Sequence, residues 1–263
     1  MTNLGPLGAT HTALDTDAAV ATATELEELG YATLWLAGGQ GNNLPRIAEV
    51  VRGTSRIQVA SGILSVDRVP SAEVAAAYSE LPAGRFVVGL GGAHGARPLA
   101  TMHDYLDEIE DVVPPSARIL SALGPRMLEL ARDRASGAYP YLVTTDYVAS
   151  AREILGAGPR LAVLLSVVAE TDQAKVREVV RGGSLKFLAG VPGYVANFRR
   201  MGFTDADIAD LSDRLVDGLT VWGDFDAVVA RLREFRAAGA DQVVVSLDSL
   251  PREWWPELAG ALA

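Results

Sequence analysis

The sequence predicts an α/β protein built as a single (β/α)₈ barrel, the TIM-barrel fold. The chain has 263 residues, of which 49% are hydrophobic, which suits one such domain. A pattern recurs along it, in which an amphipathic helix ends at a glycine and a short apolar run follows. These runs show little polar alternation, as is typical of parallel strands buried on both faces. No shift in composition marks a boundary, so residues 1–263 are expected to form one domain.

The first helix and strand show the pattern most clearly. Asp15 is placed to cap the helix, and Ala19, Ala23 and Leu26 fall on one helical face. Gly30 stands where a helix commonly ends in a left-handed residue. The apolar run at 32–36 follows directly and predicts a strand.

The later elements repeat this pattern to the end of the chain. Continuous apolar runs predict strands at 57–60, 86–90, 119–122, 139–143 and 161–167. A last helix ends at Gly239 and leads into a strand at 242–245. With a first strand near 7–10, the total is about eight, which favours the closed barrel over an open doubly wound sheet. The loop after the fourth strand is short, so segment 190–202 is the candidate substrate lid.

Composition excludes several classes of function. The formal charge of −10, with no basic cluster, disfavours a nucleic-acid partner. The sequence has no cysteine and no run of eighteen apolar residues, so neither disulfides nor a membrane span are expected. The first residues lack the pattern of a secretory signal, and a cytoplasmic location is expected. No grouping of residues has the spacing of metal ligands, and no metal is expected.

In a barrel the chemistry lies where strands run into their following loops. Small residues occupy three of these loops, where a planar ring could lie against the backbone. The candidates are Gly38, Gly39, Ser61, Gly62, Ile63, Gly91 and Gly92. An ordinary flexible turn is the alternative for each loop. The glycines at 84–95 lack the G-x-G-x-x-G spacing, which disfavours a dinucleotide site.

The loop after the fifth predicted strand has the pattern of an anion site. Gly124 makes the turn and Pro125 takes the first helical position, which leaves the amides at the helix start exposed. We therefore predict phosphate binding here, with an ordinary strand-to-helix turn as the alternative. The candidate residues are Ala122, Leu123, Gly124, Pro125 and Met127.

Few side chains of the predicted mouth could do chemistry alone. His11 and His94 follow strands, whereas His103 lies on a predicted helix at 101–111. Neither H-E-x-x-H nor G-x-S-x-G occurs, and Asp and Glu are scarce at the strand ends. Such a site indicates a protein that holds a cofactor and leaves the chemistry to it.

Three segments resemble the luciferase-like flavin and deazaflavin oxidoreductases. They are GRFVVGLG at 84–91, LGPRMLELA at 123–131 and ASGAYPYLVT at 135–144, and the likeness extends over nearly the whole chain. Details of the sequence look like the actinobacterial branch that uses coenzyme F420. The resemblance implies a barrel oxidoreductase that passes a hydride between the deazaflavin and a small organic substrate, commonly as a homodimer. An FMN-dependent monooxygenase and a catalytically degenerate, cofactor-binding barrel are the alternatives.

The resemblance also assigns residues to the cofactor. Gly124, Pro125 and Met127 would hold its phosphate, and Val143 and Thr144 would help to close that pocket. Residues 61–63 match the place where the family has a non-prolyl cis peptide under the central ring, and Gly62–Ile63 is the bond we expect to be cis.

One departure from the family concerns the proton donor. Many relatives carry an acidic residue and a histidine after the second strand, where this chain has AGGQ at 37–40. If the enzyme protonates its substrate, the candidates are His94, Tyr141 and His11, in that order. An imidazole titrates near neutrality, whereas a tyrosine would need a lowered pKa.

Overall fold

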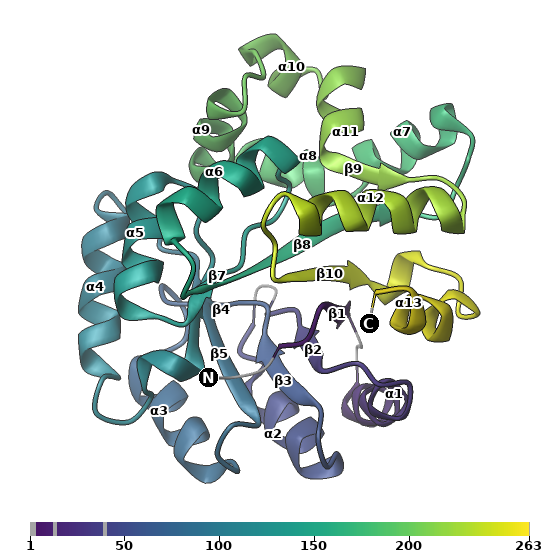
Figure 1. Ribbon diagram of the computed structural model, residues 1–263. Helices are drawn as coiled ribbons and strands as arrows, with labels where there is room; N and C mark the ends of the chain where they lie inside the picture. The colour runs from purple at the N-terminus through teal and green to yellow at the C-terminus, as the bar shows by residue number, and fades with distance from the viewer. Residues whose placement is uncertain (1–3, 13–14, 39–40, 263) are drawn as a thin grey trace.

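A computed structural model describes residues 4–12, 15–38 and 41–262. Within these residues eight parallel strands close into a barrel, because β10 pairs with both β1 and β8 (Figure 1). This closure confirms the predicted fold and excludes the open sheet. The barrel strands are β1 (Leu7–His11), β2 (Thr33–Leu36), β3 (Gln58–Ser61), β5 (Phe86–Gly91), β6 (Arg118–Leu120), β7 (Gly137–Ala138), β8 (Arg160–Val168) and β10 (Gln242–Ser246). Two short strands, β4 (Leu64–Ser65) and β9 (Thr220–Trp222), pair in parallel with the ends of β5 and β8 respectively.

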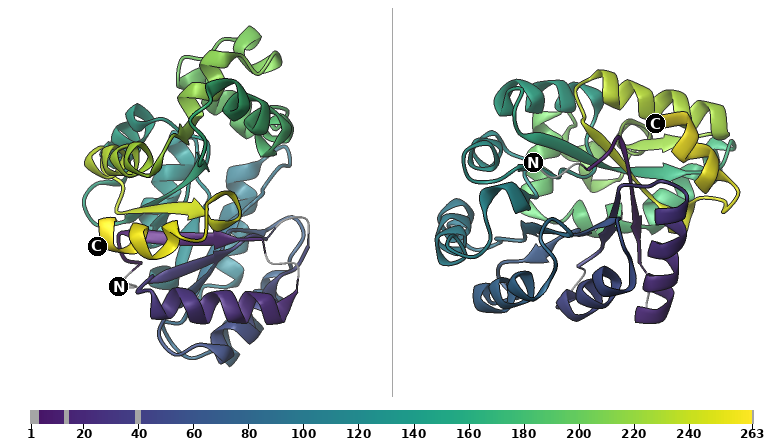
Figure 2. Two further views of the ribbon diagram at one scale, coloured as in Figure 1. Left: turned by 90° about the vertical axis from the view of Figure 1, so that its right-hand side faces the viewer. Right: turned by 60° about the horizontal axis from the view of Figure 1, so that its bottom comes forward.

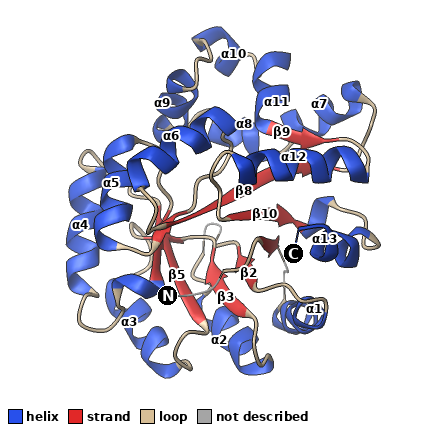
Figure 3. Ribbon diagram, in the orientation of Figure 1, coloured by secondary structure: helices blue, strands red, loops and turns tan. Residues whose placement is uncertain are grey.

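Helices surround the strands (Figure 3). They are α1 (Thr16–Glu28), α2 (Leu44–Gly53), α3 (Ser71–Glu80), α4 (Pro98–Glu108), α5 (Pro125–Arg134), α6 (Thr145–Leu155), α12 (Phe225–Ala237) and α13 (Trp254–Leu262). The predicted ends of two of them are confirmed, since Asp15 accepts a hydrogen bond from the Ala18 amide and Gly30 and Gly239 have φ of +89° and +118°. No helix in the described part of the chain is long and apolar enough to cross a membrane.

The barrel interior is a packed core. Six of its side chains come from barrel strands and one follows β7 directly, and they range from alanine to tryptophan: Trp35, Ala60, Val87, Ile119, Tyr139, Ala162 and Val244. The two large rings, Trp35 and Tyr139, fill the space that the alanines leave. This core closes the barrel below its mouth, so any ligand site must lie above it, at the carboxyl ends of the strands.

A helical excursion follows β8 and projects from the barrel (Figure 2). It comprises α7 (Gln173–Gly182), α8 (Ser184–Leu188), α9 (Pro192–Arg200), α10 (Asp205–Ala209) and α11 (Asp213–Leu219). These helices have an apolar core of their own, around Phe198 and Leu215, into which Leu142 of the loop after β7 also packs. The candidate lid segment 190–202 includes α9, which reaches the barrel mouth.

One predicted strand is displaced. The run at 139–143 was expected to be a strand, but the ladder contains only Gly137 and Ala138, with one further bridge between Tyr141 and Leu164. Pro140 has no amide hydrogen to donate to a neighbouring strand, and Leu142 has a φ of +55°. The chain therefore leaves the barrel wall early, and residues 141–144 form the mouth rather than the wall.

Candidate functional site

Strands β3 and β5 are locked together at one side of the mouth. The Ser61 hydroxyl donates to the Gly89 carbonyl at 2.9 Å and accepts from the Gly89 amide at 2.7 Å. A Cβ at Gly89 would lie 1.9 Å from the Ser61 carbonyl oxygen, so only glycine permits this approach. The next peptide bond, Gly62–Ile63, is cis, which confirms the bond expected from the sequence.

Glycines after β2 and at the end of β5 approach Ile63, while its side chain packs against the interior core. A Cβ at Gly38 would lie 1.7 Å from the Ile63 carbonyl oxygen, and one at Gly91 would lie 3.0 Å from Ile63 Cδ1. Gly92 has a φ of +74° and turns the chain away from β5. The structure thus brings Gly38, Gly62, Ile63 and Gly91 together, and we call these four residues the floor. Gly39 lies outside the described residues.

The predicted phosphate loop adjoins this floor, since a Cβ at Gly91 would lie 2.8 Å from Ser121 Cβ. Gly124 precedes α5, Pro125 begins it, and no side chain caps the helix start. The guanidinium of Arg200, from α9, stands beside this turn, because a Cβ at Gly124 would lie 3.5 Å from Arg200 Nη2. A positive helix end and a cation thus meet here, as an anion would require.

Tyr147 fixes the backbone of the phosphate loop. Its hydroxyl donates to the carbonyls of Ala122 and Leu123, at 3.0 and 3.1 Å. The Thr144 hydroxyl caps α6 by accepting a hydrogen bond from the Tyr147 amide at 3.2 Å. Tyr147 thus connects the phosphate loop at 122–127 with the predicted pocket residues Val143 and Thr144. Val143 is buried beside them, and Met127 packs partly exposed against the main core.

Tyrosines gather on this wall of the mouth. Burial raises the pKa of the hydroxyls of Tyr139, Tyr147 and Tyr194, and each of them also experiences the field of another tyrosine. Burial likewise raises the pKa of Tyr141, and hydrogen bonds with Ser184 and Ser166 lower it in part. The Tyr141 hydroxyl lies 2.9 Å from Ser184 Oγ on α8. Because each pKa lies above its ordinary value, these phenols are neutral near neutral pH and do not act as bases.

The structure separates the three candidate proton donors. His94 lies in an exposed loop, where its backbone amide donates to Asp67 at 2.8 Å. Tyr141 belongs to the tyrosine wall. His11 ends β1, and its Nδ1 lies 2.5 Å from Oδ1 of Asp248, which follows β10.

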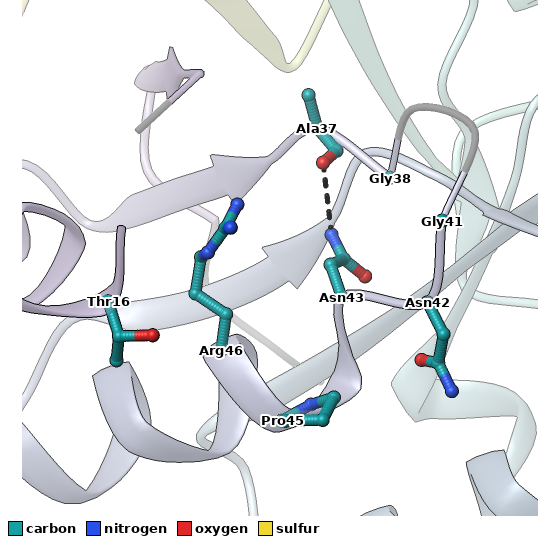
Figure 4. A pocket seen from close by; sticks show the side chains of 8 residues that line it. All are labelled: Thr16, Ala37, Gly38, Gly41, Asn42, Asn43, Pro45 and Arg46. Carbon is teal, nitrogen blue, oxygen red and sulfur yellow. Dashed lines mark hydrogen bonds between the residues drawn. The ribbon is translucent and has the colours of Figure 1, made fainter. Parts of the chain in front are cut away.

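A cavity of about 430 Å³ adjoins the mouth beside β2 (Figure 4). It lies between the loop after β2 and the first turns of α1 and α2, and is lined by Thr16, Ala37, Gly38, Gly41, Asn42, Asn43, Pro45 and Arg46. Asn43 Nδ2 donates to the carbonyls of Leu36 and Ala37, both at 3.1 Å, and so holds the loop onto the strand end. Gly38 belongs to both the cavity and the floor, which connects the two.

Sequence reasoning missed Asp248, Arg200 and Tyr147. Asp248 lies two residues beyond the last strand, and inspection of the residues after that strand would have found it. Arg200 and Tyr147 lie on helices far along the chain from the loop they contact. No local pattern distinguishes them from surface residues.

No protein-family model and no curated protein matches this chain. Solved structures do resemble it. The coenzyme F420-dependent tetrahydromethanopterin reductase from Methanopyrus kandleri superposes with a TM-score of 0.71 at 16% identity, covering 98% of each chain. An F420-dependent secondary alcohol dehydrogenase, in complex with an F420-acetone adduct, gives 0.71 at 10% identity, again over 98% of each chain. The FMN-bound oxygenating constituent of 3,6-diketocamphane monooxygenase from Pseudomonas putida gives 0.64 at 14%, over 93% of this chain and 91% of its own. The chain therefore shares the barrel fold of these proteins.

Proposed function

We propose that this protein is a luciferase-like oxidoreductase that binds coenzyme F420 across the barrel mouth and exchanges a hydride with a small organic substrate. The observation that carries the proposal is Arg200 beside Gly124 at the uncapped start of α5. A phosphate is the anion that such a site suits. The barrel fold shared with F420-dependent proteins and with an FMN-bound monooxygenase supports an oxidoreductase and is compatible with either cofactor.

The residues of the mouth fit a flat cofactor with a phosphate at one end. The start of α5 with Gly124, Pro125 and Met127, together with Arg200, would hold the phosphate, and Val143 and Thr144 would close that end. The floor at Gly38, Gly62, Ile63 and Gly91 would face the ring system. Glycine at position 38 lets the loop after β2 approach Ile63, since an added Cβ there would lie 1.7 Å from the Ile63 carbonyl oxygen. A deazaflavin, when bound, supplies the hydride acceptor or donor.

The residues of the chain would position the cofactor and exchange a proton with the substrate. Tyr147 holds the phosphate loop through two carbonyls, so the anion site is already formed before binding. Ser184 of the excursion helix α8 contacts the Tyr141 hydroxyl, so the excursion adjoins this wall of the mouth. The candidates for proton exchange are His94, Tyr141 and His11, of which Tyr141 is disfavoured as a base because burial raises its pKa.

Titration of the purified protein with coenzyme F420 and, separately, with FMN tests the proposal. We expect saturable fluorescence quenching, with calorimetric heat, for F420 at micromolar concentration and none for FMN. Binding of FMN alone would reject the F420-dependent hydride transfer and favour an FMN-dependent monooxygenase. Binding of neither would favour a degenerate barrel.

A further inference from the structure

The side chains of His11 and Asp248 meet at the barrel mouth although they come from opposite ends of the chain. β1 and β10 run side by side, with Thr10 level with Ser246, and each residue lies just at or beyond the end of its strand. His11 Nδ1 is 2.5 Å from Asp248 Oδ1, and the two side chains remain 23% and 32% exposed. The pair is thus preformed and still open to a ligand.

The carboxylate of Asp248 is held in one orientation. Its Oδ2 accepts from the backbone amide of Thr12 at 3.0 Å and from the Thr12 hydroxyl at 2.8 Å. Oδ1 is left for the imidazole. The short contact between Nδ1 and Oδ1 does not have the alignment of a hydrogen bond in the structure. A carboxylate accepts hydrogen bonds and cannot donate them, so a turn of the neutral imidazole that aligns the pair would place the hydrogen on Nδ1 and leave Nε2 as the acceptor.

The place of the pair relative to the phosphate end follows from the strand order. Three strands separate β6 from β1 on each side of the closed barrel. They are β5, β3 and β2 on one side and β7, β8 and β10 on the other. β1 therefore lies across the mouth from β6 and the anion site that follows it. The floor around Ile63 lies between them, after β3. A cofactor that spans from the anion site to this floor would leave His11 on the substrate side.

We propose that His11 is the residue that exchanges a proton with the substrate and that Asp248 is the positioning residue that fixes its tautomer. The inference rests on the proposed function and narrows its substrate to the alcohol–carbonyl class. In oxidation, Nε2 of His11 takes the hydroxyl proton while the carbinol carbon gives its hydride to the bound deazaflavin, and a carbonyl compound leaves. In reduction, the imidazolium returns that proton to the carbonyl oxygen as the carbon receives the hydride. Protons and electrons balance in both directions.

The pair would replace the acidic residue and histidine that this chain lacks after β2. The loop after β2 offers no acid or histidine at Ala37 or Gly38. His94 is in an exposed loop, and its neighbour Asp67 is engaged by a backbone amide rather than by an imidazole. Among the described histidines, His11 is the one whose imidazole lies in ion-pair distance of a carboxylate.

The first arm of the test needs no activity. Nitrogen-15 spectra of histidine-labelled protein report the tautomer of each ring, and His11→Asn identifies the His11 signals. We expect the Nδ1-protonated form in the wild type, its loss in Asp248→Asn, and no change in Asp67→Asn. An unchanged His11 tautomer in Asp248→Asn would overturn the positioning role.

The second arm measures turnover of F420 with a panel of primary and secondary alcohols and the matching carbonyl compounds. We expect His11→Asn to lower kcat by about 10²- to 10⁴-fold and Asp248→Asn by at least about tenfold. KM and F420 affinity should change less than about twofold, and the exposed control His103→Asn should behave as the wild type. Wild-type turnover by His11→Asn, or none by F420-loaded wild type across the panel, would overturn the proposal. Failure of the wild type to bind F420 would instead reject the proposed function. The tautomer measurement does not depend on F420 and would still test the positioning role of Asp248.

Discussion

The rings of Trp35 and Tyr139 stack inside the barrel, with centroids 3.9 Å apart and planes 3° from parallel. Trp35 donates its indole hydrogen to Gln242 at 3.0 Å, whereas the buried Tyr139 hydroxyl has no hydrogen-bond partner among the described residues. The ring of Tyr139 therefore contributes to stability, and its hydroxyl does not.

Tyr139→Phe should leave the free energy of unfolding unchanged or raise it by up to about 1 kcal/mol, because it removes an unsatisfied buried hydroxyl. Tyr139→Leu, which loses the stack, should lower it by about 2–4 kcal/mol. Urea unfolding of both variants measures the difference. A loss above about 1 kcal/mol in Tyr139→Phe would mean that the hydroxyl makes a stabilising bond.

Gly38→Ala should damage the floor of the site. Its new methyl group would stand 1.7 Å from the Ile63 carbonyl oxygen, so the loop or residues 62–63 must move. We expect a loss of about 1–3 kcal/mol in stability and weaker F420 binding. Gly41→Ala is the matched control in the same loop, since nothing lies within 4 Å of its added carbon. Equal F420 affinity in the two variants would refute a role for this contact in the site.

Arg200→Gln should weaken F420 binding by about tenfold, because it removes the cation beside the start of α5. The affinity for F420 should also fall less steeply with increasing salt concentration than in the wild type. Arg199→Gln is the control, since Arg199 pairs instead with Asp205 at 2.6 Å. Fluorescence titrations at low and high salt measure both variants. If they bind F420 alike, the phosphate lies elsewhere.

Glu27 joins α1 to the segment before β3. Its carboxylate accepts from the amides of Ser55, Arg56 and Ile57. Burial acts to raise the pKa of Glu27, but these hydrogen bonds outweigh it and the pKa falls below its ordinary value of 4.5. A lowered folded-state pKa stabilises the protein above the unfolded-state pKa, and this contribution disappears as the pH falls through the folded-state value.

Glu27→Gln should therefore lower the free energy of unfolding by about 1–2 kcal/mol at pH 7. The gap to the wild type should close progressively below pH 4.5. Glu28→Gln, at the exposed neighbouring position, should have little effect at either pH. Urea unfolding across this range checks the sign, and a gap that widens on acidification would contradict the assignment.

Several features of this protein were determined by the sequence alone, because they depend on neighbouring residues. Buried apolar runs located most of the barrel strands, and Asp15 and Gly30 marked the ends of α1. The cis bond at Gly62–Ile63 was expected from the family resemblance rather than from local pattern, and the structure confirms it. The displaced strand at β7 shows the limit of this reasoning. Tyr139–Pro140 is apolar enough for a strand, but the missing amide hydrogen of Pro140 ends the ladder.

Only the tertiary structure decided which side chains meet at the mouth. Barrel closure sets β10 against β1 and so joins Asp248 to His11, and the packing of the excursion core carries Arg200 to Gly124. Both contacts depend on strand register and helix packing between segments distant in sequence, which local pattern does not encode. The apolar runs and caps therefore specify the scaffold, and the way it closes specifies the site.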